Sequence, residues 1–401
     1  MRYLAVLAVL GISFSITTGA DRADVRGKEN VGSRDTGITV MIEYKGAVRH
    51  FSARTALLKY NKDLAWSFAL DDGLASGWLV AFPYFNGGRV APSFKGEWGA
   101  DQGGDGKEYP GLFFTDGCGN GVPFRAAVAI NAKSIGRPGQ LDFGQVDSLY
   151  KAGWDVFNHG YAHATGRDVD AMYECSENNK VVMDRLGIDM RQFVVPGGAG
   201  DTISEGPYTE AAFGQGMEAV HDGHFPGHTL MIDAGLSLEE MRAGRLFLYS
   251  GNIRDSMESY FREIRELLQA GKRPWINAFT HSTGNDNLWN ISLRFPDTKT
   301  FFGRLEEEYG QKGKDNIWVA SFQAVQEYLL IHQSLVYSVR RAGNRIYISI
   351  DTGKLPVGLR HKCQTFVLDS GQPIEKITCV NGSIESYSRN TAGNQLINVC
   401  W

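Results

Sequence analysis

This sequence has no large excess of positive or negative charge. Its 45 acidic residues nearly balance its 41 lysines and arginines, and the formal net charge of the 401 residues is −4. Such a balance gives no electrostatic reason to expect nucleic acid or an anionic membrane surface as a partner. Long apolar runs are also missing after residue 20, so we expect no membrane span in the rest of the chain.

Cysteine is scarce as well. The chain has five, which are Cys118, Cys175, Cys363, Cys379 and Cys400. No two of them have the short spacing of a zinc ribbon, so we expect none of them to bind a metal. Three lie in the last forty residues, which favours a disulfide there in an exported protein, and the odd count leaves at least one thiol free in a monomer. The sequence leaves the oligomeric state open.

The chain begins with the pattern of a secretory signal. Arg2 supplies a positive charge, residues 3–16 are nearly all apolar, and small residues stand at 18–20. This run is too short and wrongly flanked for a membrane span, so we interpret residues 1–20 as a signal peptide. No Cys follows directly, which argues against a lipid anchor, and the polar residues 21–35 predict a flexible lead-in. We therefore expect an exported protein, periplasmic or extracellular.

The middle of the chain alternates between strand-like and helix-like segments. Apolar runs rich in β-branched and aromatic residues predict strands over 38–44, 64–70, 124–130, 154–157, 193–195, 275–280 and 317–320. Amphipathic periodicity predicts helices over 142–152, 256–269 and 323–332. This alternation predicts an α/β fold, either a (β/α) barrel or a doubly wound sheet.

Two domains are expected after the lead-in. Residues 36–333 form the predicted barrel, and the Gly-rich stretch 85–110 within it is a long surface excursion of the kind that forms a lid or a rim. Residues 334–401 differ in texture, because short strand-like runs alternate there with turn residues. We expect this last segment to be a small β-rich accessory domain.

Two adjacent carboxylates, Asp71 and Asp72, come directly after the predicted strand 64–70 and before Gly73. Because side chains alternate along an extended chain, the two point in different directions. One can then bind a metal while the other faces the substrate and accepts a proton. The same three residues also fit an ordinary turn at the end of a strand, so this motif alone does not decide between the two interpretations.

Three histidines follow predicted strands in the same way. His159 and His163 come after 154–157, and at i and i+4 they lie on one face of a helical turn, close enough to chelate zinc or a similar divalent metal. His281 comes directly after 275–280. In parallel barrels the chemistry gathers at the carboxyl ends of the strands, so we expect these side chains and the two carboxylates to share one site.

Together these motifs resemble those of the polysaccharide deacetylases, carbohydrate esterase family 4 with its NodB homology domain. The family's Thr-Phe-Asp-Asp-Gly motif is similar to residues 69–73, its His-Ser/Thr-x-x-His motif to 159–163, and its late Leu-x-His motif to 279–281. The resemblance covers about residues 60–332. It implies a distorted (β/α) barrel and the metal-dependent removal of N- or O-linked acetyl groups from a polysaccharide or oligosaccharide.

The resemblance also implies a metal site. Asp72, His159 and His163 would bind a divalent ion, with Zn²⁺ as the first expectation and Co²⁺ or Ni²⁺ as alternatives. A shared ion requires the three side chains to lie within about 6 Å of one another. A structure in which they lie farther apart would exclude this site.

The remaining implied roles concern the reaction itself. Asp71 would be the base and His281 the acid that protonates the leaving amine or alcohol. Pro196 and Gly197 would lie beside the substrate, where a backbone N–H helps to hold the oxyanion. The chain departs from the family because Val194 stands where an Arg orients the base, Gly197 replaces an aromatic residue, and no Asp-x-x-Asp-Trp motif is present. Either another Arg reaches the base, or activity is low.

Other interpretations of these residues remain open at this point. The chain is alternatively a glycan-binding protein on a degenerate deacetylase barrel, a hydrolase of other non-peptide C–N bonds, or a non-haem iron oxygenase, since two His and one carboxylate also form that facial triad. A second cluster, His221, His224 and His228, lines the substrate groove, binds a second ion, or belongs to a polar surface loop.

Overall fold

The computed structural model describes residues 37–197, 203–237, 240–388 and 394–401. The signal peptide and lead-in predicted for residues 1–35 lie outside these described residues. Among the helices that the structure describes, none is long and apolar enough to cross a membrane.

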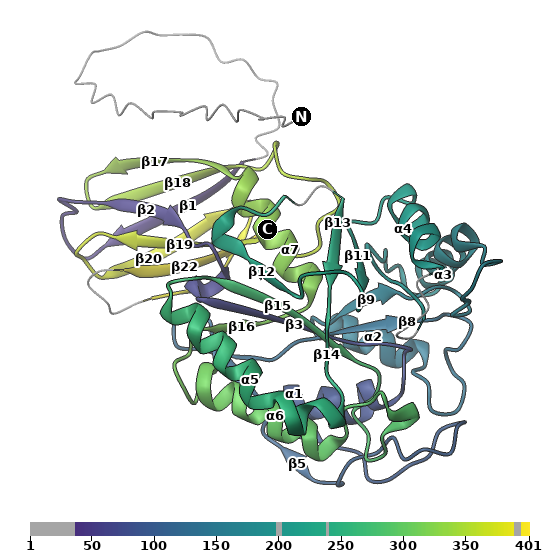
Figure 1. Cartoon of the computed structure of the whole chain (residues 1–401). Coiled ribbons are helices and arrows are strands. Elements are labelled where there is room, and N and C mark those ends of the chain that lie inside the picture. The colour runs from purple at the N-terminus through teal and green to yellow at the C-terminus, as the bar shows by residue number, and fades with distance from the viewer. Residues whose placement is uncertain (1–36, 198–202, 238–239, 389–393) are drawn as a thin grey trace, which may run out of the picture. The chain divides into compact units, whose positions relative to one another are not determined.

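A parallel β-sheet lies at the centre of the structure (Figure 1). Its parallel strands are, in spatial order, β15 (Pro274–Thr280), β3 (Leu64–Leu70), β8 (Ala127–Ile130), β9 (Asp155–Asn158), β10 (Gln192–Val194), β11 (Ala219–Asp222) and β13 (Met241–Gly244). β16 (Ile317–Val319) pairs in parallel with β3, and β12 (Thr229–Met231) pairs antiparallel with β15. Side chains on both faces are buried, as expected where helices cover a parallel sheet.

One short segment nearly closes this sheet into a barrel. β13 pairs with β11 at one end of the sheet, while β14 (Leu246–Phe247) pairs with β15 at the other end. Only Arg245 separates the two strands. The predicted distorted (β/α) barrel is therefore confirmed, and Arg245 lies at the point where the barrel closes.

Helices alternate with these strands and cover the sheet. They are α1 (Phe82–Asn86), α2 (Phe143–Lys151), α3 (Ala171–Leu186), α4 (Glu205–Gly214), α5 (Ser250–Gln269), α6 (Phe295–Tyr309) and α7 (Phe322–Ser334). Local sequence explains their ends: Asp142 and Gln145 form a capping box at the start of α2, and Gly187 ends α3 in the left-handed conformation. The predicted helices correspond to α2, α5 and α7, whereas α1, α3, α4 and α6 were not predicted.

Two antiparallel sheets form a β-rich region (Figure 1). One sheet has the order β17 (Val336–Ala342), β18 (Arg345–Asp351), β1 (Ile38–Tyr44) and β20 (Ile374–Val380), and the other has the order β2 (Ser52–Thr55), β19 (Cys363–Asp369), β22 (Gln395–Cys400) and β21 (Ser383–Tyr387). Alternate residues such as Val40, Ile348 and Phe366 form a shared core. Because β1 and β2 pair here, residues 38–55 belong to these sheets and not to the barrel segment in which the sequence placed them.

A disulfide joins two neighbouring strands of this region. Cys363 on β19 and Cys400 on β22 stand opposite each other in the ladder and are bonded. This confirms the disulfide expected in the last forty residues. Cys118, Cys175 and Cys379 are free thiols.

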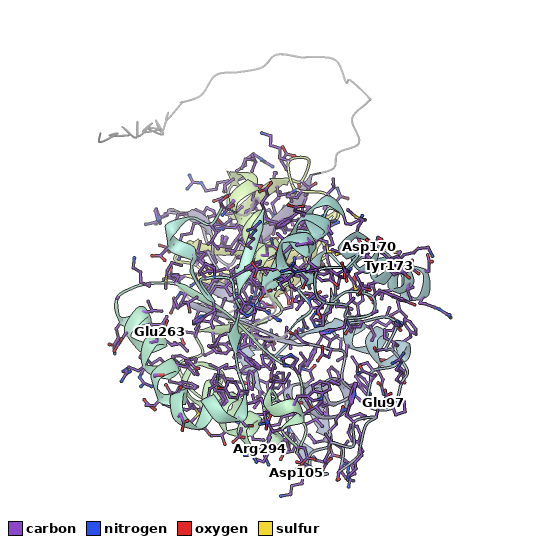
Figure 2. All side chains as sticks on the ribbon, turned by 45° about the vertical axis from the view of Figure 1, so that its right-hand side comes forward. Glu97, Asp105, Asp170, Tyr173, Glu263 and Arg294 are labelled. Carbon is purple, nitrogen blue, oxygen red and sulfur yellow. A yellow bond between two sulfur atoms is a disulfide. The ribbon has the colours of Figure 1, made fainter. Side chains whose placement is uncertain are left out.

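The Gly-rich excursion lies on the structure as a largely irregular loop. Its ends pair as β4 (Gly88–Arg89) and β5 (Glu108–Tyr109), and a hairpin of β6 (Phe113–Thr115) and β7 (Gly121–Pro123) follows. Figure 2 labels Glu97 and Asp105 of the excursion in the lower part of the view, where Arg294, which precedes α6, is also labelled. The Asp105 carboxylate lies 3.0 Å from the Lys299 ammonium of α6, so the excursion is tied to that helix.

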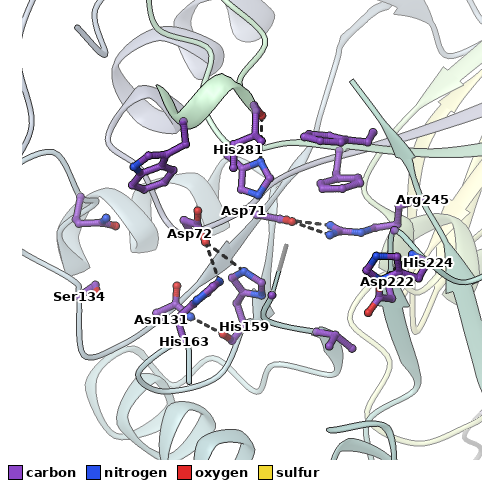
Figure 3. A pocket seen from close by; sticks show the side chains of 18 of the residues that line it. Asp71, Asp72, Asn131, Ser134, His159, His163, Asp222, His224, Arg245 and His281 are labelled. Carbon is purple, nitrogen blue, oxygen red and sulfur yellow. Dashed lines mark hydrogen bonds and ion pairs between the residues drawn. The ribbon is translucent and has the colours of Figure 1, made fainter. Parts of the chain in front are cut away.

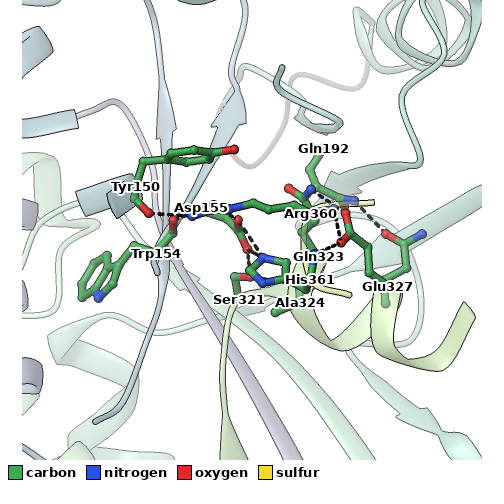
Figure 4. Close-up of polar contacts among 11 residues, drawn as sticks. Tyr150, Trp154, Asp155, Gln192, Ser321, Gln323, Ala324, Glu327, Arg360 and His361 are labelled. Atoms are coloured by element: carbon green, nitrogen blue, oxygen red, sulfur yellow. Dashed lines mark hydrogen bonds and ion pairs between the residues drawn. The ribbon is translucent and has the colours of Figure 1, made fainter. Parts of the chain in front are cut away.

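A buried polar network links the amino end of the barrel to the β-rich region (Figure 4). Asp155 begins β9 and is fully buried; its carboxylate accepts hydrogen bonds from Ser321, Arg360 and His361. Glu327 of α7 accepts the backbone N–H groups of Arg360 (2.8 Å) and His361 (2.6 Å). The segment between β18 and β19 is thereby fixed to the barrel.

Candidate active site

A cavity of about 420 Å³ opens where the carboxyl ends of the parallel strands meet (Figure 3). Most of the residues that line it lie at the ends of β3, β8, β9, β10, β11, β13 and β15 or in the loops that follow these strands. Asp71, Asp72, His159, His163 and His281 are all among them. The expectation that strand ends would bring these five side chains into one site is therefore met.

Asp72, His159 and His163 present one donor atom each to a common point. The Asp72 Oδ1 atom lies 3.3 Å from Nε2 of His159 and 3.4 Å from Nε2 of His163, and the three donors lie within 4.8 Å of one another. Two ligands at 2.0–2.1 Å from one ion in tetrahedral geometry are about 3.3–3.4 Å apart, whereas a charge-assisted hydrogen bond is shorter, at about 2.7–2.9 Å. The separations match shared coordination better than direct hydrogen bonding, and they fall inside the 6 Å limit.

The tautomer of His159 is set by a backbone carbonyl. Its Nδ1 atom lies 2.8 Å from the carbonyl oxygen of Val194, which only accepts, so Nδ1 carries the hydrogen and Nε2 offers its lone pair to the cavity. The Val194 side chain is buried in the core. The position where the family has an Arg thus serves here to orient a candidate metal ligand.

Burial and neighbouring charges set the protonation of this group. Burial alone would raise the pKa of Asp72, but the close imidazole of His159, with His281 and His163 nearby, holds it well below its usual range. Burial and the charge of His159 lower the pKa of His163. Burial alone would lower the pKa of His159, yet its interactions with Asp72 and Asp71 raise it. A carboxylate that stays ionised among imidazoles is a suitable environment for a divalent cation.

The loop that carries the two histidines is irregular, which corrects the predicted helical turn. Residues 159–163 form no helix, and both Gly160 (φ 73°) and His163 (φ 57°) adopt the left-handed conformation. A Cβ atom at Gly160 would lie 3.0 Å from the Glu174 carboxylate and 3.1 Å from Pro196, and together with the positive φ these close contacts favour glycine. Asn131 donates its amide to the carbonyls of His159 and Gly160 and clamps the loop.

Asp71 and Arg245 form a buried pair beside the candidate ligands (Figure 3). The Arg245 guanidinium donates to both oxygens of the Asp71 carboxylate, at 2.9 Å and 2.6 Å. Both residues are buried, since only 1% of Asp71 and 6% of Arg245 is exposed. Arg245 also stacks on the Phe279 ring at 3.7 Å from its centroid. Burial alone would raise the pKa of Asp71, but the charge and hydrogen bonds of Arg245 lower it. Another Arg therefore does reach Asp71, which is the first of the two alternatives that Val194 had left open.

His281 lies next to Asp71 at the edge of the cavity. Its Nδ1 atom is 3.1 Å from the carbonyl oxygen of Ile291, so Nδ1 carries a hydrogen and Nε2 is the nitrogen left to exchange a proton. The ring packs edge-on against Phe247, whose centroid is 5.6 Å away. The arrangement supplies a positioned acid or base near the Asp71 carboxylate.

Of the two residues predicted to lie beside the substrate, Gly197 lines the cavity and Pro196 does not. Gly197 lines it and is exposed, with φ at 130°. Pro196 is buried below it and packs toward Gly160. Their role in holding an oxyanion stays a prediction.

The second histidine cluster is divided by the structure. His221 is 1% exposed on β11, where it contacts Gln192 and stacks on Phe157 at 5.6 Å, so it belongs to the core and neither to a groove nor to a surface loop. His224 lines the cavity beside Asp222, with its Nδ1 3.0 Å from the carboxylate. A second ion at this position stays a prediction.

Sequence reasoning missed several residues of this site. Arg245 stands in no motif, and its neighbours gave no strand signal that would have placed it opposite Asp71. Asn131 was missed although it follows a predicted strand directly, a signal that could have found it. Trp98 and Trp289 also line the cavity; Trp98 lies in the excursion predicted as a lid or a rim but was not singled out, and the loop of Trp289 had no pattern that tied it to the site.

Comparisons with protein-family models and with curated proteins find no match. Among solved structures, the chain is similar to a protein from Mycobacterium smegmatis assigned to the polysaccharide deacetylases, with 12% identity, a TM-score of 0.39, and 70% of this chain and 95% of that chain covered. The chain is also similar to the deacetylase PplD of Streptococcus pyogenes in complex with acetate, with 11% identity and a TM-score of 0.27. This match covers 39% of this chain and only 54% of that one. A family 4 acetyl xylan esterase of Clostridium thermocellum with a cobalt ion matches at 9% identity and a TM-score of 0.24, over 41% and 60% of the two chains. Because these sequence identities and TM-scores are low, the function of this chain must be inferred from its own side chains.

Proposed function

We propose that this protein is a metal-dependent hydrolase that removes acetyl groups from a polysaccharide or oligosaccharide. The observation that carries this proposal is the Asp71–Arg245 pair, which stands beside the three donors of Asp72, His159 and His163 in one cavity. A metal site alone has many uses. A metal site with an oriented carboxylate on one side and a histidine on the other suits hydrolysis.

The three donors fit a divalent ion of the zinc type. Two imidazole nitrogens and one carboxylate oxygen are ligands that Zn²⁺ accepts, and Co²⁺ or Ni²⁺ also bind such sets. An ion held there supplies Lewis acidity, which polarises a carbonyl and makes a water more acidic. Asp72, His159 and His163 leave one side of the donor set facing the cavity, since all three line it.

Asp71 is the proposed proton acceptor. Its pKa is lowered by Arg245, so the group is a carboxylate at neutral pH and can take a proton from water. Because Arg245 binds both oxygens, the carboxylate plane is fixed. We therefore assign Arg245 as the positioning residue for the base.

His281 is the proposed proton donor to the leaving group. Its Nδ1 is engaged with Ile291, so Nε2 is the atom that would deliver a proton to the amine or alcohol of the sugar. The collapse of a tetrahedral intermediate requires such a proton, because an unprotonated amine or alkoxide leaves poorly.

The rival functions are less well supported. A degenerate, glycan-binding barrel was favoured by the missing Arg, and the contact of Arg245 with Asp71 removes that support. Iron oxygenases with a facial triad use β-sandwich jelly rolls, whereas these residues follow the strands of a (β/α) barrel. Hydrolysis of a different non-peptide C–N bond uses the same groups and is distinguished by substrate alone.

Export is also proposed for this protein. The apolar run over 3–16 supports a signal peptide, and the disulfide between Cys363 and Cys400 supports an oxidising compartment, periplasmic or extracellular.

The decisive test measures acetate released with and without metal. Protein freed of metal with a chelator and then supplied with Zn²⁺, Co²⁺ or Ni²⁺ is incubated with N-acetylglucosamine oligomers, acetylated xylan and peptidoglycan fragments. We expect acetate release only in the reloaded protein, and elemental analysis should find about one zinc per chain when no metal is added. Bound metal without acetate from any of these substrates would overturn the proposal in favour of a binding protein.

A further inference from the structure

Two exposed indoles stand at the mouth of the cavity. Trp98 is 45% exposed and Trp289 is 47% exposed, and among the tryptophans that the structure describes no other is exposed. Their ring centroids are 4.9 Å apart at an angle of 67°, and both residues line the cavity. A pair of large apolar rings left in water at the edge of a site marks a surface that binds something.

The two loops that carry the indoles are fastened to each other. The backbone N–H of Asp101 donates to the Asp286 carboxylate at 2.8 Å, and the backbone N–H of Asp286 donates to the Asp101 carbonyl at 2.9 Å. Asn285 adds hydrogen bonds to Asp101 (3.1 Å) and Gly104 (3.0 Å). The excursion and the loop after β15 thus hold the rings as a preformed surface.

The backbone that carries the Trp289 ring has a sparsely populated conformation. Trp289 (φ 52°) and Asn290 (φ 60°) both adopt the left-handed conformation, which is unusual for a tryptophan. Strain of this kind is retained where the surrounding structure enforces it and is concentrated at functional sites.

The indoles lie on the side of the cavity from which a leaving group departs. Trp289 is two residues before Ile291, whose carbonyl fixes the ring of His281. In the proposed reaction His281 protonates the leaving group, and that group is the sugar. The sugar that carries the acetyl group, and its neighbours in the glycan, must therefore extend past His281 toward Trp289.

We propose that Trp98 and Trp289 form a stacking platform for a second pyranose ring, next to the ring whose acetyl group enters the cavity. The faces of pyranose rings carry C–H groups that pack on indoles, so the platform selects oligosaccharides over monosaccharides. This inference rests on the proposed function in one respect, because the role of His281 in that reaction places the sugar on the Trp289 side of the cavity. Two indoles offer at most a few hundred Å², well below the about 1,000 Å² of a stable protein interface, so a single ring is the better-fitting occupant.

The test follows KM and kcat along a series of chain lengths. Zinc-loaded wild type, Trp98→Ala, Trp289→Ala and Trp289→Phe are assayed for acetate release from the N-acetylglucosamine monomer through pentamer and from acetylated xylo-oligomers. We expect both Ala variants to raise KM about tenfold for the oligomers, with kcat within about twofold and the monomer unaffected. Trp289→Phe should retain most of the affinity. Equal KM values for wild type and both Ala variants at every length overturn the platform.

A matched control comes from the β-rich region. Tyr347 on β18 is a half-buried aromatic residue that does not line the cavity. The centroid of its ring lies 4.3 Å from the Arg340 guanidinium. Tyr347→Ala should leave KM unchanged at all lengths. Thermal melts of each variant separate loss of binding from loss of folding.

Binding without turnover separates the two proposals. Metal-free protein is titrated with the same oligomers and with peptidoglycan fragments by isothermal titration calorimetry, which does not depend on the indoles as reporters. Pentamer binding by the wild type that is weakened about tenfold in Trp98→Ala and Trp289→Ala supports the platform even if the wild type releases no acetate, in which case only the hydrolase proposal fails. Absence of both binding and turnover with every glycan overturns both.

Discussion

The barrel carries two buried Asp–Arg–His groups, one at each end. At the carboxyl end Asp71 is paired with Arg245 near His281, and at the amino end Asp155 is paired with Arg360 and His361 (Figures 3 and 4). Both carboxylates are almost fully buried, with 1% and 0% of their surface exposed. The residue types and the burial of the carboxylate are therefore similar in the two groups.

What differs is the room and the free donors around each group. The Asp155 carboxylate accepts hydrogen bonds from three side chains, Ser321, Arg360 and His361, and beside His361 there is a cavity of only about 50 Å³. The group at the carboxyl end opens onto a cavity of about 420 Å³, which the donors of Asp72 and its two histidines also face. A buried ion pair is structural where all its groups are satisfied, and it becomes a candidate for catalysis where unpaired donors and space adjoin it.

The largest effect should come from removing one candidate metal ligand. Asp72 has φ at 68°, a conformation that Asn tolerates, so Asp72→Asn changes the ligand and preserves the backbone. We expect metal affinity to collapse and kcat/KM to fall by about a thousandfold or more, with the melting temperature of the metal-free protein nearly unchanged. Zinc titration, acetate release and thermal melts of both proteins measure this. If the Asp72→Asn protein bound metal and remained active, the carboxyl end of the barrel would not be the catalytic site.

A comparable change at the amino end should act on stability alone. Arg360→Met leaves the Asp155 carboxylate buried with one cation fewer, which costs about 3 kcal/mol of unfolding free energy. Urea denaturation gives this value, and acetate release per folded molecule should equal that of the wild type. If Arg360→Met lowered activity in the folded protein as strongly as Asp72→Asn, the two groups would not differ in the way proposed.

The Arg at the carboxyl end should act on rate. Lys keeps the charge of Arg245 but cannot bind both oxygens of Asp71, so Arg245→Lys should lower kcat by about 10- to 100-fold while zinc affinity is retained. Arg242→Lys is the matched control, because Arg242 is exposed on β13, the strand that directly precedes Arg245, and its guanidinium lies over the Phe225 ring, 5.9 Å from the centroid. Full activity of Arg245→Lys would show that the fixed plane of the carboxylate is unimportant.

The sequence predicted the parts of the site that are local. Asp71, Asp72, His159, His163 and His281 follow strands, and strand ends can be recognised from apolar runs that stop at polar residues. Their convergence then follows from parallel topology alone. The conformation of the histidine loop could not be predicted, because two left-handed residues depend on what Asn131 and Pro196 contact in the folded protein.

The parts that were missed depend on long-range pairing. Arg245 reaches Asp71 because β13 and β14 pair with opposite ends of the sheet, and no local pattern reports that closure. β1 has the alternation of any half-buried strand, so its sequence does not reveal that its partners are β18 and β20. The excursion was recognised as a possible rim from its glycines, but its contact with Asp286 was not.

The smallest expected effect is a difference in acid stability at the amino end. Burial alone would raise the pKa of Asp155, but the charge and hydrogen bond of His361, followed by Arg360, lower it to about 2 from an ordinary 3.8. A lowered carboxyl pKa gives stability that is complete above about pH 4 and is lost as the pH falls through 2, and the shift corresponds to about 2 kcal/mol. Asp155→Asn lacks this titration. Urea denaturation of both proteins from pH 5 to pH 2 should therefore show the advantage of the wild type shrinking by about 2 kcal/mol as the solution is acidified. Parallel curves over that range would mean that the Asp155 pair is not held as an ion pair, and the contrast between a closed structural group and an open catalytic one would lose its electrostatic basis.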